Sequence, residues 1–483
     1  MPSKKLVTAV FDIGKTNKKL LFFDESLSVV QSTTRVFDEI TDDDGHPCDD
    51  LESITAWLLG EVEKMPQYKE FEVTSVNFSA YGATLVHLDE EGKPITPLYN
   101  YLKPYPEEVL EEFYQKYGGK EEFSTVTASP PMGMLNSGLQ IYWLKKKKPQ
   151  LFSQIKTMLH FPQYLSYLLT GKSVSEKTSI GCHTGMWNFR EDNYHRWLED
   201  EEILKLLPEI EPVTKSFEAK IGDARIRAGI GIHDSSAALA PYLMAFDDPF
   251  ILLSTGTWSI AMNPFTADSL TYEELKRDCL HYLNIYGNPV KASRFLLGGE
   301  YSHQLNKLGG YFGRNPDKFD CEPDIRLIKK MMNDSSHEKR LVLEKSQTSG
   351  PYPDEKSGEW NLSRFENYEE ATHRCLLDLA SIQADALKLA EGSGRIDKVI
   401  LTGGFAKNFF FCRLLASMLP GKKLYTASLT DASALGAAIL MKEPVPAEKL
   451  KNQLELDQQK PFEKLNLYNY SWASVSDHRK QSE

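Results

Sequence analysis

The sequence predicts a mixed α/β protein built from two similar domains. Apolar, β-branched segments that end in glycine-containing turns recur along the chain, and several of them lead into segments with helical spacing. The hairpin-like segment VTAVFDIGKTNKKLLFF at residues 7–23 is echoed by FILLSTGTWSIAMNP at residues 250–264. This short internal repeat predicts two related domains with a boundary near residue 240. We expect domains at 1–240 and 241–445, followed by a charged and polar extension at 446–483.

The N-terminal half is predicted to alternate strands and helices. Residues 5–36 have the composition of three strands joined by the polar turns GKTN and DESL. Residues 71–94 predict a strand, a Tyr-Gly loop, a second strand and an EEGKP turn. Helical spacing extends over residues 52–65 and 139–170. The basic run at 145–148 is interpreted as the solvated C-terminal end of a helix.

Three strand-to-helix transitions lie between residues 228 and 441. AGIGIHDSSAALAPYL predicts a strand, a turn and a helix that begins at Asp234. IDKVILTGGFAKNFFF predicts a strand, a Gly-Gly turn and an amphipathic helix. LYTASLTDASALGAAILM predicts a short strand, a polar loop and a helix of small residues.

Composition excludes several classes of protein. The chain has 483 residues, of which 41% are hydrophobic and 26% charged, as in globular proteins with more than one core. Its formal net charge of −12 argues against nucleic acid as the main partner. The six cysteines form no CxxC pair and are interpreted as reduced core thiols of a cytoplasmic protein. Because no run of about 18 apolar residues occurs, we expect no membrane insertion.

The segment AVFDIGKTNKK contains GKT but is not predicted to be a P-loop. The GxxxxGK[ST] fingerprint requires a glycine where Ala9 stands, and the strand-like LLFFD follows where a helix is needed. A tight turn between antiparallel strands instead presents successive backbone N–H groups that hold phosphate oxygens. Asp12, at the end of the first strand, suits Mg²⁺, which prefers carboxylate and water oxygens. The alternative interpretation is a surface hairpin whose lysines serve solubility.

Asp234 is the candidate general base. It stands where a strand turns into a helix, and a carboxylate there would accept a proton from a substrate hydroxyl during phosphoryl transfer. His233 and Ser235 flank it as candidate hydrogen-bonding groups for the substrate. The alternatives are a helix N-cap for Asp234 and simple packing for His233.

Two glycine turns are candidate nucleotide contacts. Gly256 and Thr257 belong to a second hydroxyl-rich turn, which suits either a phosphate or an ordinary hairpin. Gly403 and Gly404 separate an apolar strand from a helix, and their bare backbone leaves room for a flat ring. The GxGxxG fingerprint is missing, so a dinucleotide-binding fold and an oxidoreductase are disfavoured.

In this order, the first hairpin, the Tyr-Gly loop, HDSSAAL, STGTWSI, TGGFAKN and DASALGAA resemble FGGY-family carbohydrate kinases. The segments HDSSAAL, STGTWSI and FPQYLSYLLTGK are most similar to the rhamnulokinase and fuculokinase branch. The resemblance covers residues 5–445. It implies two ribonuclease H-like domains of the actin/hexokinase/Hsp70 ATPase superfamily around a deep cleft, with the sugar mostly on the N-terminal domain and ATP on the C-terminal domain.

The resemblance also implies roles for individual residues. Asp234 matches the catalytic base, and Asp12 matches the carboxylate that helps to place Mg²⁺. Residues expected to bind ATP are Gly14, Lys15, Thr16, Asn17, Lys19, Gly256, Thr257, Gly403, Gly404 and Asn408. Residues expected to bind the sugar are Tyr81, Gly82, His233 and Ser235.

The sequence departs from the family pattern at the sugar side. Lys15 replaces a small or hydroxyl residue in the first turn, and Tyr81 stands where tryptophan is common. The segment YNYLKPY lacks the Asp and Arg of a YRDxR-like stretch, and Arg294 cannot be aligned securely. These departures leave the ATP chemistry intact and the identity of the sugar open.

The sequence therefore predicts ATP- and Mg²⁺-dependent phosphorylation of a sugar hydroxyl. The expected substrate is a ketose, either a 6-deoxy-ketohexose such as rhamnulose or fuculose, or a pentulose. One alternative is a catalytically weak ATP or sugar sensor of the same fold, which would be expected to have lost either Asp234 or Asp12. An Hsp70- or actin-like ATPase would need a partner-binding region for which the chain leaves little room. We expect a monomer or homodimer.

Overall fold

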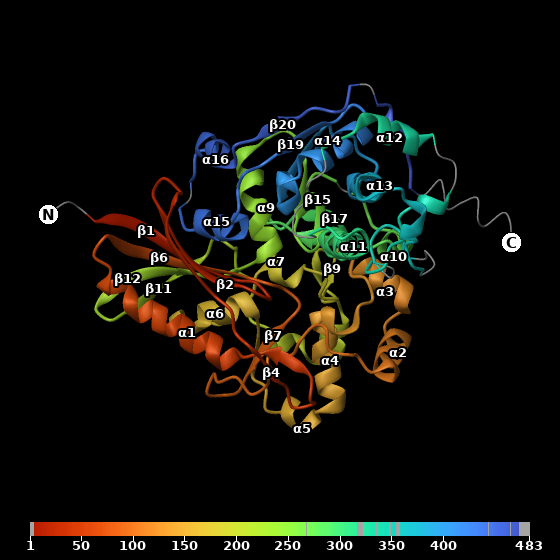
Figure 1. Cartoon of the computed structure of the whole chain (residues 1–483). Helices are drawn as coiled ribbons and strands as arrows, with labels where there is room; N and C mark the ends of the chain where they lie inside the picture. Colours follow the sequence, from red (N-terminus) through yellow and green to blue (C-terminus); the bar gives the residue numbers. More distant parts are fainter. Residues whose placement is uncertain are drawn as a thin grey trace. The chain divides into compact units, whose positions relative to one another are not determined.

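The computed structural model describes residues 4–472, except 267, 316–321, 334–336, 347–348, 354–357, 443 and 464 (Figure 1). The chain divides into two compact units, each assembled from three segments. Unit 1 comprises Met1–Asp247, His281–Pro289 and Asp431–Gln453. Unit 2 comprises Asp248–Leu280, Val290–Thr430 and Leu454–Glu483. The division into 1–240, 241–445 and 446–483 stays a prediction.

Unit 1 is built on a twisted seven-stranded sheet with the order β11-β12-β6-β1-β2-β3, in which β13 also pairs with β6. β1 is antiparallel to β2 and parallel to β6. The predicted hairpin at the N-terminus and its third strand are thereby confirmed. The strands are β1 Lys5–Ile13, β2 Lys18–Asp24, β3 Val29–Arg35, β6 Phe71–Ala80, β11 Ser216–Ile221, β12 Ala224–Gly229 and β13 Ile232–His233.

The two faces of this sheet carry different helices. Alternate residues of β1 point to opposite faces; Val7, Ala9, Phe11 and Ile13 join the core formed with α1 (Leu51–Lys64) and α6 (Phe161–Thr170). α15 (Ala432–Ile439) packs on β1, β6 and α9 (Asp234–Ala245). In Figure 1, the red strands of the sheet lie next to the blue α15, although the two are far apart in the sequence.

Smaller elements complete unit 1. One of them, β8, interrupts the region 139–170, so the expectation of helix throughout that region is wrong. The segment TMLH leaves the helical pattern because it pairs with β7 in register, Leu85 opposite His160. These elements are β4 Glu39–Thr41, β5 Pro47–Asp49, η1 Met65–Gln67, β7 Leu85–Leu88, α2 Glu107–Lys116, α3 Lys120–Val126, η2 Gly133–Leu135, α4 Ser137–Lys147, α5 Pro149–Phe152, β8 Thr157–His160, α7 Lys177–Ile180, β9 Trp187–Asn188, β10 Asn193–Tyr194, α8 Trp197–Asp200 and η3 Leu204–Leu206.

Unit 2 repeats the strand pairing of unit 1. Its sheet has the order β16-β17-β15-β14-β18-β19-β20, and β14 is antiparallel to β15 and parallel to β18. β14 therefore holds the position that β1 holds between β2 and β6, as the internal repeat predicts. The strands are β14 Ile251–Thr255, β15 Ser259–Asn263, β16 Cys279–Leu283, β17 Pro289–Phe295, β18 Lys398–Gly403, β19 Lys423–Thr426 and β20 Asp457–Gln459.

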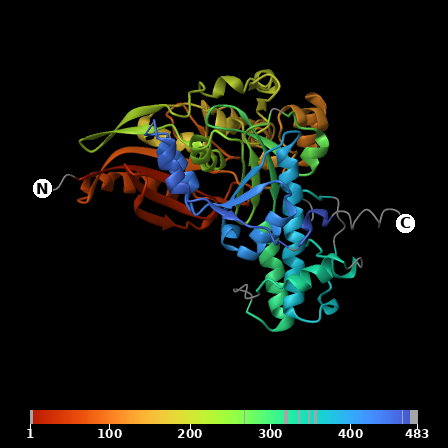
Figure 2. The same cartoon turned by 90° about the horizontal axis from the view of Figure 1, so that it is seen from above.

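The core of unit 2 is largely helical. α11 and α13 run side by side, green and blue in Figure 2, and α13 contributes most of its residues to the core. Phe462, Leu467 and Trp472 are buried in the same core, so part of the predicted polar extension is packed. The helices of unit 2 are α10 Tyr272–Lys276, α11 Leu297–Phe312, α12 Ile325–Met332, η4 His337–Lys339, η5 Leu362–Arg364, α13 Tyr368–Glu391, η6 Gly404–Lys407, α14 Phe409–Met418 and η7 Leu467–Asn469. The helix α16 Ala447–Leu454 belongs to unit 1 except for its last residue.

Two further expectations concern the whole chain. Cys48, Cys182, Cys279, Cys375 and Cys412 are free and buried, as predicted for core thiols, whereas Cys321 lies outside the described residues. In the part of the chain that the structure describes, no helix combines the length and the apolar character needed to cross a bilayer.

Candidate functional site

The candidate residues of unit 1 meet where three parallel strands end together. In the central strand β6, Ser79 pairs with Asp12 of β1 on one side and with Ile232 of β13 on the other. Adjacent strands lie about 4.8 Å apart, so Asp12 and the residues that follow β13 belong to the same edge of the sheet. This edge is where open α/β sheets place their ligands.

Asp12 points to the face of the sheet that α15 covers. Ser433 Oγ, in the first turn of α15, donates a hydrogen bond of 2.9 Å to Asp12 Oδ2. Burial raises the pKa of the Asp12 carboxyl to about 6, and the negative charge of Asp234 contributes to that rise. The hydrogen bonds from Ser433 and Ser79 and the positive charge of Lys19 act in the opposite direction.

The turn between β1 and β2 is closed by a hydrogen bond of 2.9 Å from Gly14 N–H to Asn17 O. Thr16 and Asn17 are exposed at its tip. Lys19 lies opposite Asp12 in the β1–β2 pairing, and its Nζ contacts Asp431 Oδ1 at 2.8 Å. That hydrogen bond raises the pKa of Lys19. The structure therefore brings Asp12, Lys19 and the turn together at the edge.

Asp234 is the first residue of α9, immediately after β13. A third of its side chain is exposed (33%), and partial loss of hydration through burial raises the pKa of the carboxyl to about 6. Ser235 Oγ donates a hydrogen bond of 3.2 Å to Asp234 Oδ1. A carboxylate whose pKa lies this close to neutrality suits proton transfer. The predicted helix start at Asp234 is confirmed.

His233 is buried and neutral, because burial lowers the pKa of its imidazole to about 3. Ser236 Oγ donates to Leu283 O at 2.9 Å, so it accepts from His233 Nδ1 at 3.3 Å, and the ring carries its proton on Nδ1. The lone pair of Nε2 then lies 3.3 Å from Asp234 Oδ1. Two acceptors face each other, which disfavours the ionised form of Asp234.

The backbone that leads to Asp234 is fixed by buried polar side chains. Thr178 Oγ1 accepts a hydrogen bond of 3.2 Å from His233 N–H and donates one of 2.8 Å to Glu176 Oε1. Gln163 Nε2 donates to Ile230 O and Gly231 O. Burial raises the pKa of Glu176, and its carboxylate accepts hydrogen bonds from the N–H groups of Thr178 and Ser179. The sequence analysis missed this group, although TGKSVSEKTS shows a carboxylate and hydroxyls grouped after a helix.

The Tyr-Gly loop that follows β6 touches the same residues. A Cβ on Gly82 would lie 2.4 Å from Cys182 Sγ and 3.1 Å from His233 Cδ2, so only glycine fits there. Tyr81 is buried, and its hydroxyl donates a hydrogen bond of 2.8 Å to Asp49 Oδ2. The structure thus brings Gly82 and His233 together and points the Tyr81 hydroxyl toward β5.

The lysines of the first turn are less available than the sequence indicates. Lys15 Nζ pairs with Glu39 Oε1 at 2.8 Å and with Asp49 Oδ2 at 2.7 Å. Lys18 is buried, and its Nζ donates to Asp49 Oδ1 at 2.9 Å and to Lys15 O at 2.8 Å. The side chain of Lys15 is therefore held by carboxylates, and its contact with ATP stays a prediction.

In unit 2, the candidate glycines lie at the ends of two paired strands. Thr255 of β14 lies opposite Gly403 of β18 in the register. Gly403 has φ +88°, and a Cβ there would lie 1.9 Å from Thr255 O. Thr255 Oγ1 donates to Thr402 O at 2.5 Å and accepts from Phe405 N–H at 3.1 Å. These contacts shape the backbone on which Gly256 and Gly404 stand.

A pocket of about 600 Å³ opens beside these strand ends. Its volume lies in the range of small-molecule sites. Asn408 caps α14, accepting a hydrogen bond of 3.0 Å from Phe411 N–H, and Tyr301 and Phe405 supply aromatic surface. The lining residues are Gly256, Thr257, Gly298, Tyr301, Ser302, Glu322, Pro323, Gly404, Phe405, Lys407, Asn408, Phe409 and Phe410. Four of the five residues predicted to bind ATP in this half of the chain thus line one pocket.

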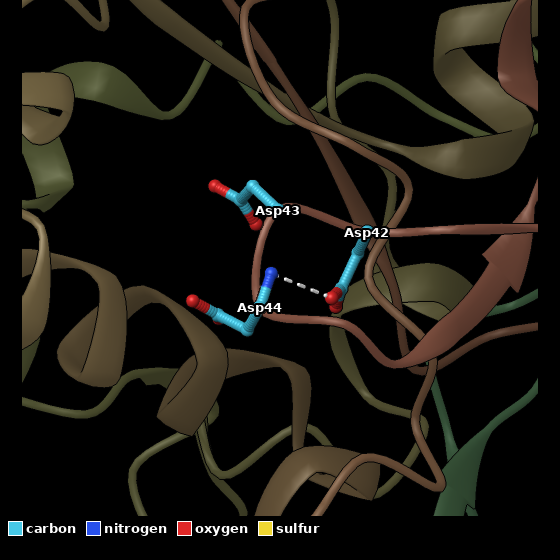
Figure 3. A group of neighbouring side chains, drawn as sticks. All are labelled: Asp42, Asp43 and Asp44. Carbon is cyan, nitrogen blue, oxygen red and sulfur yellow. Dashed lines mark hydrogen bonds between the residues drawn. The ribbon is translucent and has the colours of Figure 1, made fainter.

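A triplet of acidic residues, Asp42, Asp43 and Asp44, stands in the turn between β4 and β5 (Figure 3). Each of its three carboxylates contacts one of two lysines. Lys103 Nζ pairs with Asp42 at 2.7 Å and with Asp44 at 2.5 Å, and Lys148 Nζ pairs with Asp43 at 2.6 Å. The triplet is therefore explained as an ion-pair cluster with two lysines.

Comparison with known proteins gives the family. The model of the N-terminal domain of the FGGY family of carbohydrate kinases matches residues 7–229, and that of the carbohydrate kinase FGGY C-terminal domain matches residues 247–449. The chain belongs to the FGGY family of carbohydrate kinases. The predicted resemblance, including the rhamnulokinase branch, is confirmed.

Individual relatives of this FGGY chain are distant. A rhamnulokinase of Halalkalibacterium halodurans is 25% identical over 52% of this chain and 54% of its own length. The match therefore spans about half the length of that relative. A rhamnulokinase of Bacillus subtilis is 22% identical over 94% of this chain and 93% of its own length. The crystal structure of a carbohydrate kinase from Novosphingobium aromaticivorans has a TM-score of 0.78 at 24% identity and covers 98% of this chain and 99% of its own. The fold is thus that of FGGY kinases, and the predicted two-domain class is confirmed.

Several residues that contact the candidate residues were not singled out from the sequence. Asp431 and Ser433 contact Lys19 and Asp12, and the DASALGAA segment that contains them is the signal that could have found them. Arg294, which could not be aligned, pairs with Asp278 Oδ1 at 2.5 Å, and its guanidinium lies 5.5 Å from the ring of Trp258.

The residues at the edge of unit 1 fit a magnesium ion. Asp12 and Asp234 are two carboxylates at one strand edge, and the charge of the second raises the pKa of the first. A divalent cation relieves that repulsion, and magnesium prefers carboxylate oxygens.

Proposed function

We propose that this protein phosphorylates a hydroxyl of a ketose with ATP. The observation that carries the proposal is the joint position of Asp12 and Asp234 at one strand edge, beside the glycine turn and Lys19. Phosphoryl transfer needs such positioning and charge neutralisation more than covalent chemistry.

Asp234 is proposed as the general base. Its carboxyl has a pKa of about 6, so it is ionised at neutral pH and still basic enough to take a proton. His233 Nε2 carries a lone pair beside it and is available to accept a hydrogen bond from a substrate hydroxyl. Ser235 donates to the carboxylate and orients it. Water must be excluded, because it competes with the sugar as the nucleophile.

ATP is proposed as the phosphoryl donor, with its adenosine part in the pocket of unit 2. The aromatic surface of Tyr301 and Phe405 suits a purine, and bare backbone at Gly404 allows close approach. Asp12 would hold Mg²⁺, which neutralises charge on the phosphates. Lys19 and the N–H groups of the β1–β2 turn other than that of Gly14, which donates to Asn17 O, would stabilise the charge of the transferred group.

The proposed substrate class is a 6-deoxy-ketohexose such as rhamnulose or fuculose, or a pentulose. The two rhamnulokinase relatives support a ketose, at low identity. The second candidate, a catalytically weak sensor, is disfavoured because both Asp12 and Asp234 are present and lie at the same edge.

The test is an ADP-release assay with Mg-ATP over a panel of ketoses, aldoses and polyols. We expect one or a few ketoses to stimulate ADP release, and Asp234→Asn to lower kcat by about 10²–10⁴-fold while ATP still binds. Asp223→Asn, at an exposed position in the β11–β12 turn, is the matched control and should behave like the wild type. Near-normal turnover by Asp234→Asn would refute the base. ATP binding without stimulation by any sugar would favour the sensor.

A further inference from the structure

Asp49, at the end of β5, connects two parts of the site that the sequence treats separately. Its carboxylate accepts hydrogen bonds from Lys15 Nζ at 2.7 Å, Lys18 Nζ at 2.9 Å and Tyr81 OH at 2.8 Å. Lys15 and Lys18 belong to the β1–β2 turn, and Tyr81 belongs to the Tyr-Gly loop. These donors lower the pKa of Asp49, so it stays ionised across the neutral range.

The contact with Lys18 makes the negative charge of Asp49 a requirement of this arrangement. Only 1% of the Lys18 side chain is exposed, and a buried ammonium group requires an anion beside it. Lys18 Nζ also donates to Lys15 O, so the same ammonium group fixes the backbone of the turn. The Lys15–Glu39 pair is less demanding, because 46% of the Glu39 side chain is exposed.

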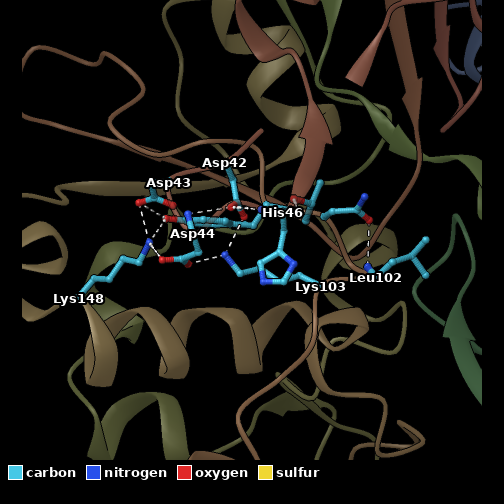
Figure 4. Close-up of polar contacts among 10 residues, drawn as sticks. Asp42, Asp43, Asp44, His46, Leu102, Lys103 and Lys148 are labelled. Carbon is cyan, nitrogen blue, oxygen red and sulfur yellow. Dashed lines mark hydrogen bonds and ion pairs between the residues drawn. The ribbon is translucent and has the colours of Figure 1, made fainter. Parts of the chain in front are cut away.

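Asp49 itself is held by a hairpin with a second anchor. β4 and β5 pair in register, Glu39 opposite Asp49, and the turn between them carries the acidic triplet. Figure 4 shows Lys103 and Lys148 reaching into this turn. Lys103 is buried, and its ammonium group lies 4.7 Å from the centre of the Trp143 ring. The β4–β5 hairpin is thus held at its turn by Lys103 and Lys148. At the other end, Asp49 is held by its hydrogen bonds from Lys15, Lys18 and Tyr81.

We propose that Asp49 is a positioning residue that sets the phosphate-binding turn and the sugar-facing Tyr-Gly loop relative to each other. The inference rests on the proposed function, because it takes the turn to meet ATP and the loop to meet the sugar. Lys15 then serves the site through Asp49 rather than through direct contact with a phosphate. Removal of the carboxylate should disturb both substrates at once, whereas removal of one donor should disturb mainly its own side.

Three substitutions test this. Tyr81→Phe should raise KM for the sugar about 5- to 10-fold and leave KM for ATP within 2-fold. Lys15→Met should raise KM for ATP more than KM for the sugar. Asp49→Asn should raise both KM values and lower kcat at least 10-fold. The matched control is Glu39→Gln, which removes the exposed partner of the same Lys15 and should stay within 2-fold of the wild type. In a double-mutant cycle, Lys15→Met and Tyr81→Phe should be non-additive with Asp49 present and additive in the Asp49→Asn background.

The outcomes separate this inference from the proposed function. Additive effects with Asp49 present, or unchanged KM values in Asp49→Asn, overturn the inference. If no sugar stimulates ADP release by the wild type, the proposed function fails, and hydrogen exchange still tests the connection. Residues 14–19 and 79–84 should then both lose protection in Asp49→Asn relative to Glu39→Gln. Retained protection in either segment overturns the inference, as does equal loss in Glu39→Gln.

Discussion

Ser433 Oγ donates a hydrogen bond of 2.9 Å to Asp12 Oδ2, although 421 positions separate the two residues. The contact shows that α15 packs against the sheet that contains the N-terminal strand β1. It also shows how the carboxylate is oriented, because the hydroxyl of Ser433 fixes one of its oxygens. Asp431, two residues earlier, accepts a hydrogen bond from Lys19 Nζ in an ion pair of 2.8 Å. The candidate magnesium and phosphate contacts therefore depend on a segment from the far end of the chain.

The pH dependence of the reaction should reveal the raised pKa values. The proposed base works only when ionised, so kcat/KM for the sugar should be low at about pH 5, rise through about pH 6 and level off above it. Because Asp12 also titrates at about 6, the acid limb should be steeper than for one proton, and excess Mg²⁺ should move it to lower pH. Steady-state kinetics across pH provide the measurement. A limb centred near pH 4, the ordinary aspartate range, would contradict the assignment.

Asp12→Asn should make the ligand-free protein more stable at alkaline pH. The folded pKa of about 6 lies above the unfolded value, so ionisation disfavours the folded state increasingly from about pH 4 to about pH 6, and fully above that. Asparagine avoids this cost and still accepts from Ser433. We expect a gain of about 1–2 kcal/mol at pH 8, discounted for partial exposure, and none at pH 4. Thermal unfolding without Mg²⁺ measures it, and equal gains at both pH values would disagree with this account.

Two adjacent glycines should respond differently to alanine. Gly403→Ala places a Cβ 1.9 Å from Thr255 O at a φ of +88°, so unit 2 should lose stability and the Tm should fall by several degrees. Gly404→Ala meets no atom within 4 Å and should keep the wild-type Tm. Because Gly404 lines the pocket, its variant should instead raise KM for ATP. Calorimetry together with ATP titration separates the two effects, and a Tm loss in Gly404→Ala would argue against this reading of the backbone.

Thr178 should matter for turnover without touching substrate. Thr178→Val removes the acceptor of the His233 N–H, and an unpaired buried N–H costs about 1–3 kcal/mol. We expect kcat to fall about 10-fold or more with KM for ATP unchanged, since the displaced group is the base. Thr178→Ser keeps the hydroxyl and should restore most of the activity. If serine and valine behave alike, the hydroxyl does not position Asp234.

Much of the local structure could be predicted, because it depends on neighbouring residues. Apolar segments beside glycine turns predicted both hairpins. The carboxylate that follows an apolar segment predicted that α9 begins at Asp234. The helix expected over 139–170 failed at β8, whose pairing with β7 outweighs its helical spacing.

Contacts between distant segments could not be predicted in the same way. Lys15 looked free for a phosphate because its partner Asp49 lies 34 residues further along, in a hairpin with no distinctive pattern. The small residues of DASALGAA did indicate that this helix packs closely on a neighbour. A Cβ at Gly436 would lie 1.8 Å from Ala237 O, so glycine there permits the close packing of α15 on α9. The sequence shows that such a helix packs tightly, but it does not say against which partner.

The return of residues 431–453 to unit 1 has a consequence during synthesis on the ribosome. Roughly 180 residues separate Asp247 from α15, which at about 5–20 residues per second means a wait of about 10–40 s. Throughout that interval the nascent N-terminal part lacks the helix that covers β1, β6 and α9, and its apolar surface is open to chaperones. A fragment that stops short of α15 would carry the same exposed surface permanently.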